Sequence, residues 1–427
     1  MDLSNLDRWN SWWKTGQVKE GWLKSFRRDL YYQIKPYLGK RQIILFQGLR
    51  RVGKTTLLFQ IIDELLKTIS SKNILYFSFD EQVPDIQEVL ETYQKYILEK
   101  SFDKNKEPIY LFFDEVQKVE NWENKIKVYY DLYPNLKFFL SGSASVRLRK
   151  KSKESLAGRV FDFTLDPLSF KEFLSLRGVD VDQVKKKPMI WKQEVLPHFY
   201  RYIKYGSFPE LVNEENEEVA KKYILETIVE RIIYKDLPEE FSIKDLGLLR
   251  TLVTIAGQKP GVLLNFQQLA RDLGKDPRTI AVYFEYLEFS LLVRYVFNYR
   301  GSPLASMRKA KKIYFATPNI IFAFSTSLEQ ALPVMLENLV VNAVQAKFFY
   351  TNGFEVDVVV QNKEKLIGIE VKTEQKKVQQ LQKFLNKFGK KVERAMLITL
   401  EEEGKEQGFA VVPAWKFLLQ PFPEGKK

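Results

Sequence analysis

The sequence predicts an α/β protein with a parallel sheet core, a helical region and a second, separate α/β unit at the C-terminal end. Between residues 42 and 142, short apolar runs alternate with longer helical stretches, which is typical of a parallel sheet with crossover helices. These runs cover residues 43–46, 74–79, 109–113 and 137–140. A length of 427 residues is enough for about three domains.

The remaining elements follow in chain order. The aromatic-rich opening segment is expected to be helical and to pack on the sheet unit. Residues 167–241 have a helical pattern that breaks at 205–209, and 246–289 contain three amphipathic segments. Two strands are expected at 291–299 and 312–316, and a helix near 333–348. Further strands are expected at 355–360, 366–372 and 394–399.

The composition excludes several kinds of chemistry. The chain has no cysteine and one histidine, so disulfides, thiolate metal sites and a cysteine nucleophile are excluded, and His198 is expected to pack among aromatic residues. Sixty-seven Lys and Arg against 54 Asp and Glu leave a net charge of +13, which favours a polyanionic partner such as nucleic acid, or a solvated basic surface. The acidic N-terminus and the lack of a long uncharged apolar run predict a cytoplasmic protein with no membrane span.

A phosphate-binding loop is the strongest motif. After the strand at 43–46, the chain reads G-x-x-x-x-G-K-T and continues into an amphipathic helix. Glycines let backbone N–H groups face phosphate oxygens, and the helix N-terminus adds positive potential. We expect Lys54 to reach the β- and γ-phosphates of ATP and Thr55 to ligate Mg²⁺; the alternative is a glycine-rich turn without a ligand. The expected nucleotide-binding residues are Gly48, Leu49, Arg50, Arg51, Val52, Gly53, Lys54, Thr55 and Thr56.

Two acidic residues end the strand at 109–113. Asp114 is expected to hold Mg²⁺ through its water shell, and Glu115 to orient and deprotonate the attacking water. Ser143, after the strand at 137–140, is expected to sense the γ-phosphate, unless it belongs to a simple turn. Arg159 is expected to supply charge to a nucleotide in the same subunit or in a neighbouring subunit of a homo-oligomer, with an unpaired surface arginine as the alternative.

These motifs resemble a known family. Gly48-Leu-Arg-Arg-Val-Gly-Lys-Thr55, Phe113-Asp-Glu-Val-Gln117, Leu140-Ser-Gly-Ser-Ala, Leu156-Ala-Gly-Arg159 and Tyr205-Gly-Ser-Phe-Pro-Glu are similar to those of archaeal and bacterial AAA+-like ATPases often labelled DEXX-box ATPases. The resemblance covers nearly the whole chain. It implies a P-loop NTPase core at 1–165, a helical lid at 166–241, a winged helix at 242–318 and a PD-(D/E)XK nuclease-like domain at 319–427.

The winged helix is expected from a helix–turn–helix pattern at 266–287. Asp276 is a plausible N-cap followed by Pro277, and we expect Arg278, Thr279 and Tyr283 at or near the exposed face. The next two strands would form the wing and contact DNA phosphates, unless the fold serves only protein packing. Basic residues near its turn are Arg300, Arg308, Lys309, Lys311 and Lys312.

The C-terminal hairpin carries a second acidic constellation. Strand alternation puts Glu370 and Lys372 on one face. If 362–365 is the loop, Gln361 pairs with Leu366 and Asp357 lies opposite Glu370, about 4.5–5.5 Å apart and close enough to share a divalent ion. Lys372 would then polarise a scissile phosphate.

This arrangement resembles the PD-(D/E)XK nuclease superfamily at Glu337, Asp357, Glu370 and Lys372, with Val356 in place of the usual proline. The sequence leaves open whether the site cleaves DNA or holds a structural ion. Our hypothesis is therefore a Mg²⁺-dependent ATPase coupled to DNA binding or processing, with a metal-dependent nuclease site as a further prediction. The alternative is a nucleotide-dependent scaffold that binds DNA or partners without cutting. The DNA structure recognised, the oligomeric state and the pathway stay open.

Overall fold

The computed structural model describes residues 1–142, 156–258, 261, 263–301, 305–306, 311–373, 378–420 and 422. The chain forms two compact units, Met1–Asp166 and Pro167–Lys427. The first contains a five-stranded parallel sheet and the second an eight-stranded mixed sheet. The predicted α/β class with a parallel sheet core is confirmed.

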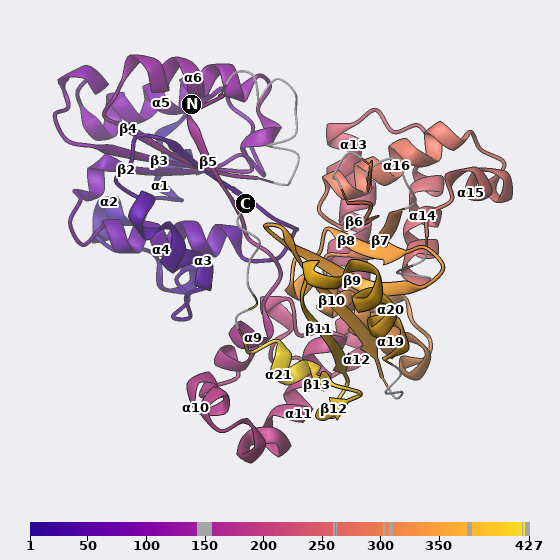
Figure 1. Ribbon diagram of the computed structural model, residues 1–427. Helices are drawn as coiled ribbons and strands as arrows, with labels where there is room; N and C mark the ends of the chain where they lie inside the picture. The colour runs from indigo at the N-terminus through magenta and orange to yellow at the C-terminus, as the bar shows by residue number, and fades with distance from the viewer. Residues whose placement is uncertain are drawn as a thin grey trace. The chain divides into compact units, whose positions relative to one another are not determined.

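The first unit is a layered α/β fold with the strand order β2-β3-β4-β1-β5. Its strands are β1 (Ile43–Gln47), β2 (Ile74–Ser78), β3 (Ile109–Asp114), β4 (Leu136–Gly142) and β5 (Val160–Thr164). Its helices are α1 (Leu3–Asp7), α2 (Trp12–Thr15), α3 (Asp29–Ile34), α4 (Lys54–Leu65), α5 (Ile86–Tyr93) and α6 (Trp122–Leu132). Helices α3 and α4 lie on one face of the sheet, and α5 and α6 on the other (Figure 1). The four strands expected from the sequence are present, whereas β5 was not expected.

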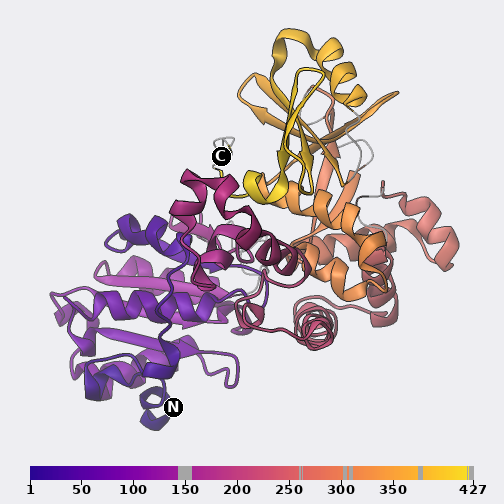
Figure 2. The same cartoon turned by 90° about the horizontal axis from the view of Figure 1, so that it is seen from below.

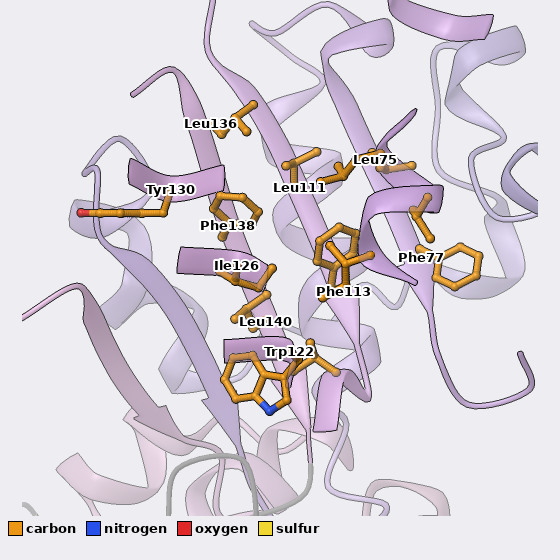
Figure 3. Close-up of a cluster of buried hydrophobic side chains, with 14 of the residues drawn as sticks. Leu75, Phe77, Leu111, Phe113, Trp122, Ile126, Tyr130, Leu136, Phe138 and Leu140 are labelled. Atoms are coloured by element: carbon orange, nitrogen blue, oxygen red, sulfur yellow. The ribbon is translucent and has the colours of Figure 1, made fainter. Parts of the chain in front are cut away.

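The core between the sheet and the helices α5 and α6 explains why these strands are apolar throughout. Alternate residues of β2, β3 and β4 point toward this layer, where Trp122 and Ile126 of α6 meet them (Figure 3). The intervening residues are buried as well, because α3 and α4 cover the other face. Helix cover on both faces therefore accounts for apolar runs without polar alternation.

The N-terminal segment closes one edge of this sheet. The side chain of Asn10 accepts a hydrogen bond from the backbone N–H of Tyr76 at 2.7 Å and donates to its carbonyl at 2.9 Å. The indole N–H groups of Trp12 and Trp13 both donate to the carbonyl of Ile74. These side chains satisfy backbone groups of edge strand β2 that would otherwise be open to pairing.

The second unit begins with helices and ends with strands. Its helices are α9 (Phe170–Leu176), α10 (Val181–Lys186), α11 (Pro188–Lys204), α12 (Glu217–Tyr223), α13 (Leu237–Glu240), α14 (Leu246–Gln258), α15 (Phe266–Leu273), α16 (Pro277–Phe289), α18 (Pro318–Phe324), α19 (Leu328–Ala343), α20 (Gln379–Phe388) and α21 (Ala414–Phe417). Its strands are β6 (Val293–Asn298), β7 (Lys311–Phe315), β8 (Phe348–Thr351), β9 (Glu355–Asn362), β10 (Lys365–Lys372), β11 (Val392–Thr399), β12 (Gly404–Glu406) and β13 (Phe409–Pro413).

The strands expected to form a wing are part of the large sheet, whose order is β12-β13-β11-β10-β9-β8-β6-β7. Strand β6 pairs with β7 in antiparallel and with β8 in parallel orientation. The helices α14 to α16 lie at the β6–β7 end, away from the C-terminal strands drawn in yellow (Figures 1 and 2). The wing strands and the C-terminal strands therefore share one sheet.

Two local predictions need correction. The hairpin turn contains only residues 363 and 364, because Asn362 pairs with Lys365, and Lys363 has the positive φ of 54° that a tight hairpin turn favours. Helix α19 begins after Ser327, whose side chain caps it, and ends at Ala343 rather than near 348. Pro333 thus lies inside the helix and does not start it. In the described ranges, no helix has both the length and the apolar character needed to cross a membrane.

Candidate functional site

The phosphate loop between β1 and α4 is built around two glycines and a lysine. A Cβ atom at Gly48 would lie 2.4 Å from the carbonyl oxygen of Leu165, and Gly53 has φ of 98°, so side chains are disfavoured at both positions. The Lys54 ammonium donates to the carbonyls of Gly48 at 3.0 Å and Leu49 at 3.2 Å. The loop therefore curls around a buried cation at the start of α4, an arrangement suited to phosphate oxygens.

Asp114 is the hub of the hydrogen bonds beside this loop. Its Oδ2 atom accepts from the hydroxyls of Thr55 at 2.6 Å and Tyr76 at 3.0 Å. Its Oδ1 atom accepts from the hydroxyl of Ser141 and from the backbone N–H of Glu115 at 3.1 Å. The carboxylate is buried and fixed by donors from four different places. The hydroxyl oxygen of Thr55 and the carboxylate oxygens of Asp114 are suitable ligands for Mg²⁺, which prefers hard oxygen ligands.

Glu115 directly follows β3 in a strained backbone conformation. Its φ is 54°, which is uncommon for a residue with a side chain. Burial raises the pKa of its carboxyl, and Asp114 adds to the rise, although Lys54 and the hydrogen bond from Gln117 act against it. A carboxylate with a raised pKa next to a phosphate site is suited to accept a proton from water.

Two residues at this site, Tyr76 and Arg28, were not singled out from the sequence. Tyr76 was read as a strand residue, but its hydroxyl donates to Asp114. Ser141 belongs to the polar run expected beside the γ-phosphate, and its hydroxyl also donates to Asp114. Arg28 donates to the carbonyls of Val52 in the loop and Asp166 after β5, both at 2.9 Å. Strand alternation in the sequence gives no signal for Tyr76, because β2 is buried on both faces.

One predicted residue does not join the site, and the position of another is not described. Ser143 lies outside the described residues. Arg159 is at the opposite end of the parallel sheet, where its carbonyl accepts from the N–H of Ile43, about 13 Å of strand away from Gln47. Its guanidinium binds Asp131 through two hydrogen bonds of 3.0 and 3.2 Å. Arg159 therefore cannot reach a nucleotide bound at the loop of its own subunit.

The second acidic constellation lies on the β9–β10 hairpin. The register runs from Gln361–Leu366 to Val358–Ile369, so Asp357 and Glu370 come next, as the sequence predicted. The Lys372 ammonium is 2.7 Å from Glu370 Oε1 and 3.5 Å from Asp357 Oδ2. Asp357 Oδ2 also accepts from the N–H of Val371 at 2.8 Å. Burial, and then the charge of Asp357, raise the pKa of Glu370 to about 8.

Glu337 is engaged by residues of β7. It accepts hydrogen bonds from the Tyr314 hydroxyl and from Lys312 at 3.3 Å, and Lys312 also binds Glu355 at 2.7 Å. Burial acts against the charge of Lys312, but Glu337 and Glu355 outweigh it and hold its pKa above the usual value. Burial, and then Asp357, raise the pKa of Glu337.

The burial of Lys312 corrects one of the DNA contacts expected for the wing. Lys312 is 4% exposed and cannot reach a DNA phosphate, while Arg308 and Lys309 lie outside the described residues. In the helix–turn–helix, Asp276 caps α16 as predicted and Arg278 is exposed. Tyr283, however, is buried, and its hydroxyl accepts from the N–H of Asp245 at 3.1 Å.

A cation fits the hairpin only through two carboxylates. In the part of the chain that the structure describes, no group of three or more carboxylate or imidazole side chains converges on one point. Glu370 Oε2, however, is buried without a hydrogen-bond partner. An unpartnered buried carboxylate oxygen costs free energy unless a cation or proton satisfies it. Asp357 and Glu370 therefore form the part of this constellation that is able to hold an ion.

The comparisons with known proteins support an AAA-type domain in the first unit. Residues 40–174 match the model of an AAA domain, whereas 196–327 and 334–417 match two domains of unknown function. An uncharacterised protein of Methanocaldococcus jannaschii is 28% identical over 433 residues, covering 93% of this chain and 91% of that protein. An uncharacterised protein of Haemophilus influenzae is 30% identical over 279 residues, and this match covers 62% of this chain and 65% of that protein.

Similar solved structures include the Aeropyrum pernix ORC1 protein in complex with DNA, with a TM-score of 0.29, 14% identity and coverage of 69% of this chain and 90% of that one. The Saccharomyces cerevisiae Hsp104–ADP complex has a TM-score of 0.30 and 16% identity, and the match covers 62% of this chain and 39% of that chain. Such TM-scores do not establish a shared architecture. The AAA domain match, together with the loop and the parallel sheet, supports an AAA-type P-loop ATPase that uses ATP.

Proposed function

We propose that the hydrolysis site of this ATPase consists of the loop at 48–56 together with Asp114 and Glu115. One observation carries the assignment: the Thr55 hydroxyl and the Asp114 carboxylate lie 2.6 Å apart beside the loop that encloses Lys54. In this proposal Lys54 binds the β- and γ-phosphates, and Thr55 and Asp114 hold Mg²⁺, with Asp114 acting through water. Mg²⁺, when bound, neutralises charge that develops on the phosphates. Glu115 accepts the proton of the attacking water.

The test separates nucleotide binding from turnover. Lys54→Ala should weaken ATP binding, because the phosphates lose their nearest cation. Glu115→Gln should bind ATP as the wild type does but stall hydrolysis, because an amide cannot accept the proton. Glu120→Gln, the same change at an exposed carboxylate nearby, is the matched control. Wild-type turnover in Glu115→Gln would refute the assignment of Glu115.

For the second unit, we infer that ATP hydrolysis is coupled to DNA. The net charge of +13 and the exposed Arg278 at the start of α16 support a polyanionic partner. We further propose that Asp357 and Glu370 hold a divalent ion, with Lys372 placed to contact a phosphate; the unpartnered Glu370 Oε2 supports this.

The corresponding assay measures phosphate release and strand cleavage together, with Mg²⁺ or Mn²⁺ and single-stranded, duplex or branched DNA. Asp357→Asn should abolish cleavage and leave ATP hydrolysis intact, and Glu393→Gln, an exposed carboxylate on β11, is the control. Cleavage that survives both Asp357→Asn and Glu370→Gln would place the nuclease activity elsewhere.

A nucleotide-dependent scaffold is the second candidate function. It is favoured by the engagement of Glu337 with Lys312 and Tyr314, which leaves the hairpin with two carboxylates for an ion. In this alternative DNA stimulates ATP hydrolysis, but no strand is cut under any of these conditions.

A further inference from the structure

A row of exposed lysines lies on helix α20 and on the 3-10 turn Gly389–Lys391 that follows it. Lys383, Lys387, Lys390 and Lys391 are all exposed. None of them forms an ion pair with a carboxylate among the residues that the structure describes. We call these four residues the α20 surface. Leu381 and Phe384 of this helix are buried against the sheet. Lys383 lies on the solvent side, and Lys387 flanks the buried side with its ammonium 5.4 Å from the ring centroid of Tyr350.

The sequence of this segment is also rich in positive charge. Residues 375–392 contain six lysines and no Asp or Glu, with Glu374 and Glu393 at the two flanks. Exposed lysines on two other helices of the second unit have acidic neighbours: Lys222 pairs with Glu226, and the run at 185–187 follows Asp180 and Asp182 closely. Both of those lysine groups lie beside carboxylates of their own helix, whereas helix α20 itself contains no Asp or Glu.

The helix covers the sheet face that carries the acidic constellation. A Cβ atom at Gly368 would lie 2.9 Å from the ring of Phe384, so Gly368 faces α20. Because strand side chains alternate, Glu370 and Lys372 project from the same face as Gly368. Figure 1 shows α20 beside β9 and β10. The lysines and the hairpin carboxylates thus belong to one side of the sheet.

We propose that the α20 surface binds the sugar-phosphate backbone of duplex DNA next to Asp357, Glu370 and Lys372. This rests on the proposed DNA function and names the surface that performs it. From Lys383 to Phe388 helix α20 rises about 7.5 Å at about 1.5 Å per residue, and Lys390 and Lys391 follow in the 3-10 turn. Duplex DNA carries roughly four charges over about 7.5 Å, enough to pair with all four ammonium groups. Such contacts position the duplex and do not read its sequence.

The experiment compares four full-length proteins, the wild type and three variants, in titrations of a labelled duplex at several salt concentrations. The test variant changes Lys383, Lys387, Lys390 and Lys391 to Gln. The control variant removes the same charge by changing four exposed lysines elsewhere in the second unit, Lys185, Lys186, Lys187 and Lys244, to Gln. A third variant, in which the four α20 lysines are changed to Arg, keeps the charge and should keep the affinity for the duplex.

If all four lysines contact phosphates, the log–log salt slope of the test variant should be smaller than that of the wild type by about 3.6, or about 0.9 per contact. Between 50 and 200 mM salt, the wild type should then lose roughly 150-fold more affinity than the test variant. The control variant should keep the wild-type slope. Basal ATP hydrolysis and the thermal unfolding midpoint should be the same in all proteins, which shows that the test variant is folded.

Each other outcome has a definite meaning. Wild-type affinity and slope in the test variant would overturn the α20 surface while leaving the DNA function in place. Absence of salt-dependent duplex binding by the wild type would overturn both. Binding of polyglutamate as tight as that of duplex DNA would identify an acidic polypeptide as the ligand and overturn the DNA assignment.

Discussion

The buried carboxyl of Glu370 should make the second unit less stable as the pH rises. Its pKa is about 8 in the folded chain against 4.5 for an ordinary glutamate, mainly because of burial and then Asp357. Between these two values the folded state binds more protons than the unfolded state, so the free energy of unfolding falls with rising pH. For this one group, the loss between pH 5.5 and pH 8.5 is about 3 kcal/mol. Glu370→Gln retains the shape of the protonated acid and removes this titration.

The assay is urea unfolding of the wild type and Glu370→Gln across that pH range. The difference in unfolding free energy should grow by about 3 kcal/mol in favour of Glu370→Gln between the two ends of the range. Glu393→Gln, at an exposed carboxyl on β11, should follow the wild type. A wild-type curve parallel to that of Glu370→Gln would refute the reasoning. Mn²⁺ should stabilise the wild type at pH 8.5 but not Glu370→Gln, because an ion that binds only the folded carboxylates shifts the unfolding equilibrium.

Three further predictions concern the first unit. Gly48→Ala should lower the free energy of unfolding by about 1–3 kcal/mol, measured in urea, because its Cβ would lie 2.4 Å from a backbone oxygen of Leu165. Tyr76→Phe removes a buried hydroxyl that donates to Asp114, so the free energy of unfolding should fall by about 1.5–3 kcal/mol. The Mg²⁺ concentration for half-maximal ATP hydrolysis should rise, and an unchanged Mg²⁺ dependence would limit Tyr76 to a structural role. Arg159→Gln should leave ATP hydrolysis unchanged and cost at most about 1 kcal/mol as a surface ion pair, whereas loss of hydrolysis would indicate that Arg159 acts in a neighbouring subunit.

The sequence predicted the elements whose signals are local. The phosphate loop is a contiguous motif, and the hairpin register followed from strand alternation once Gln361 was paired with Leu366. The cap of α16 by Asp276 is local in the same way. In each case the residues that determine the geometry lie within about twenty positions of one another, so their spacing carries the information.

Contacts between distant segments could not be read from spacing. Ser141 and Tyr76 reach Asp114 only because β2, β3 and β4 are neighbours in the sheet. Arg159 was expected to supply charge to ATP. The motif around Arg159 does not indicate at which end of a strand the residue lies, so its distance from the loop could not be predicted. Its place at the amino end of β5 follows from the parallel pairing of that strand with β1, and β5 was not expected from the sequence.

The buried Lys312 shows how far the acidic constellation depends on the strands before it. Lys312 belongs to β7, yet it binds Glu337 of α19 and Glu355 of β9. Without Lys312, Glu337 would keep only the Tyr314 hydroxyl as a hydrogen-bond donor in the described part of the chain, and Tyr314 also lies on β7. A buried carboxylate that loses its cation costs several kcal/mol. Because β6 also pairs with β8, residues 319–427 by themselves would lack both the neighbouring strands and the cation. The hairpin constellation is therefore a property of the whole eight-stranded sheet, and any ion or DNA bound there is coupled to β6 and β7 through these contacts.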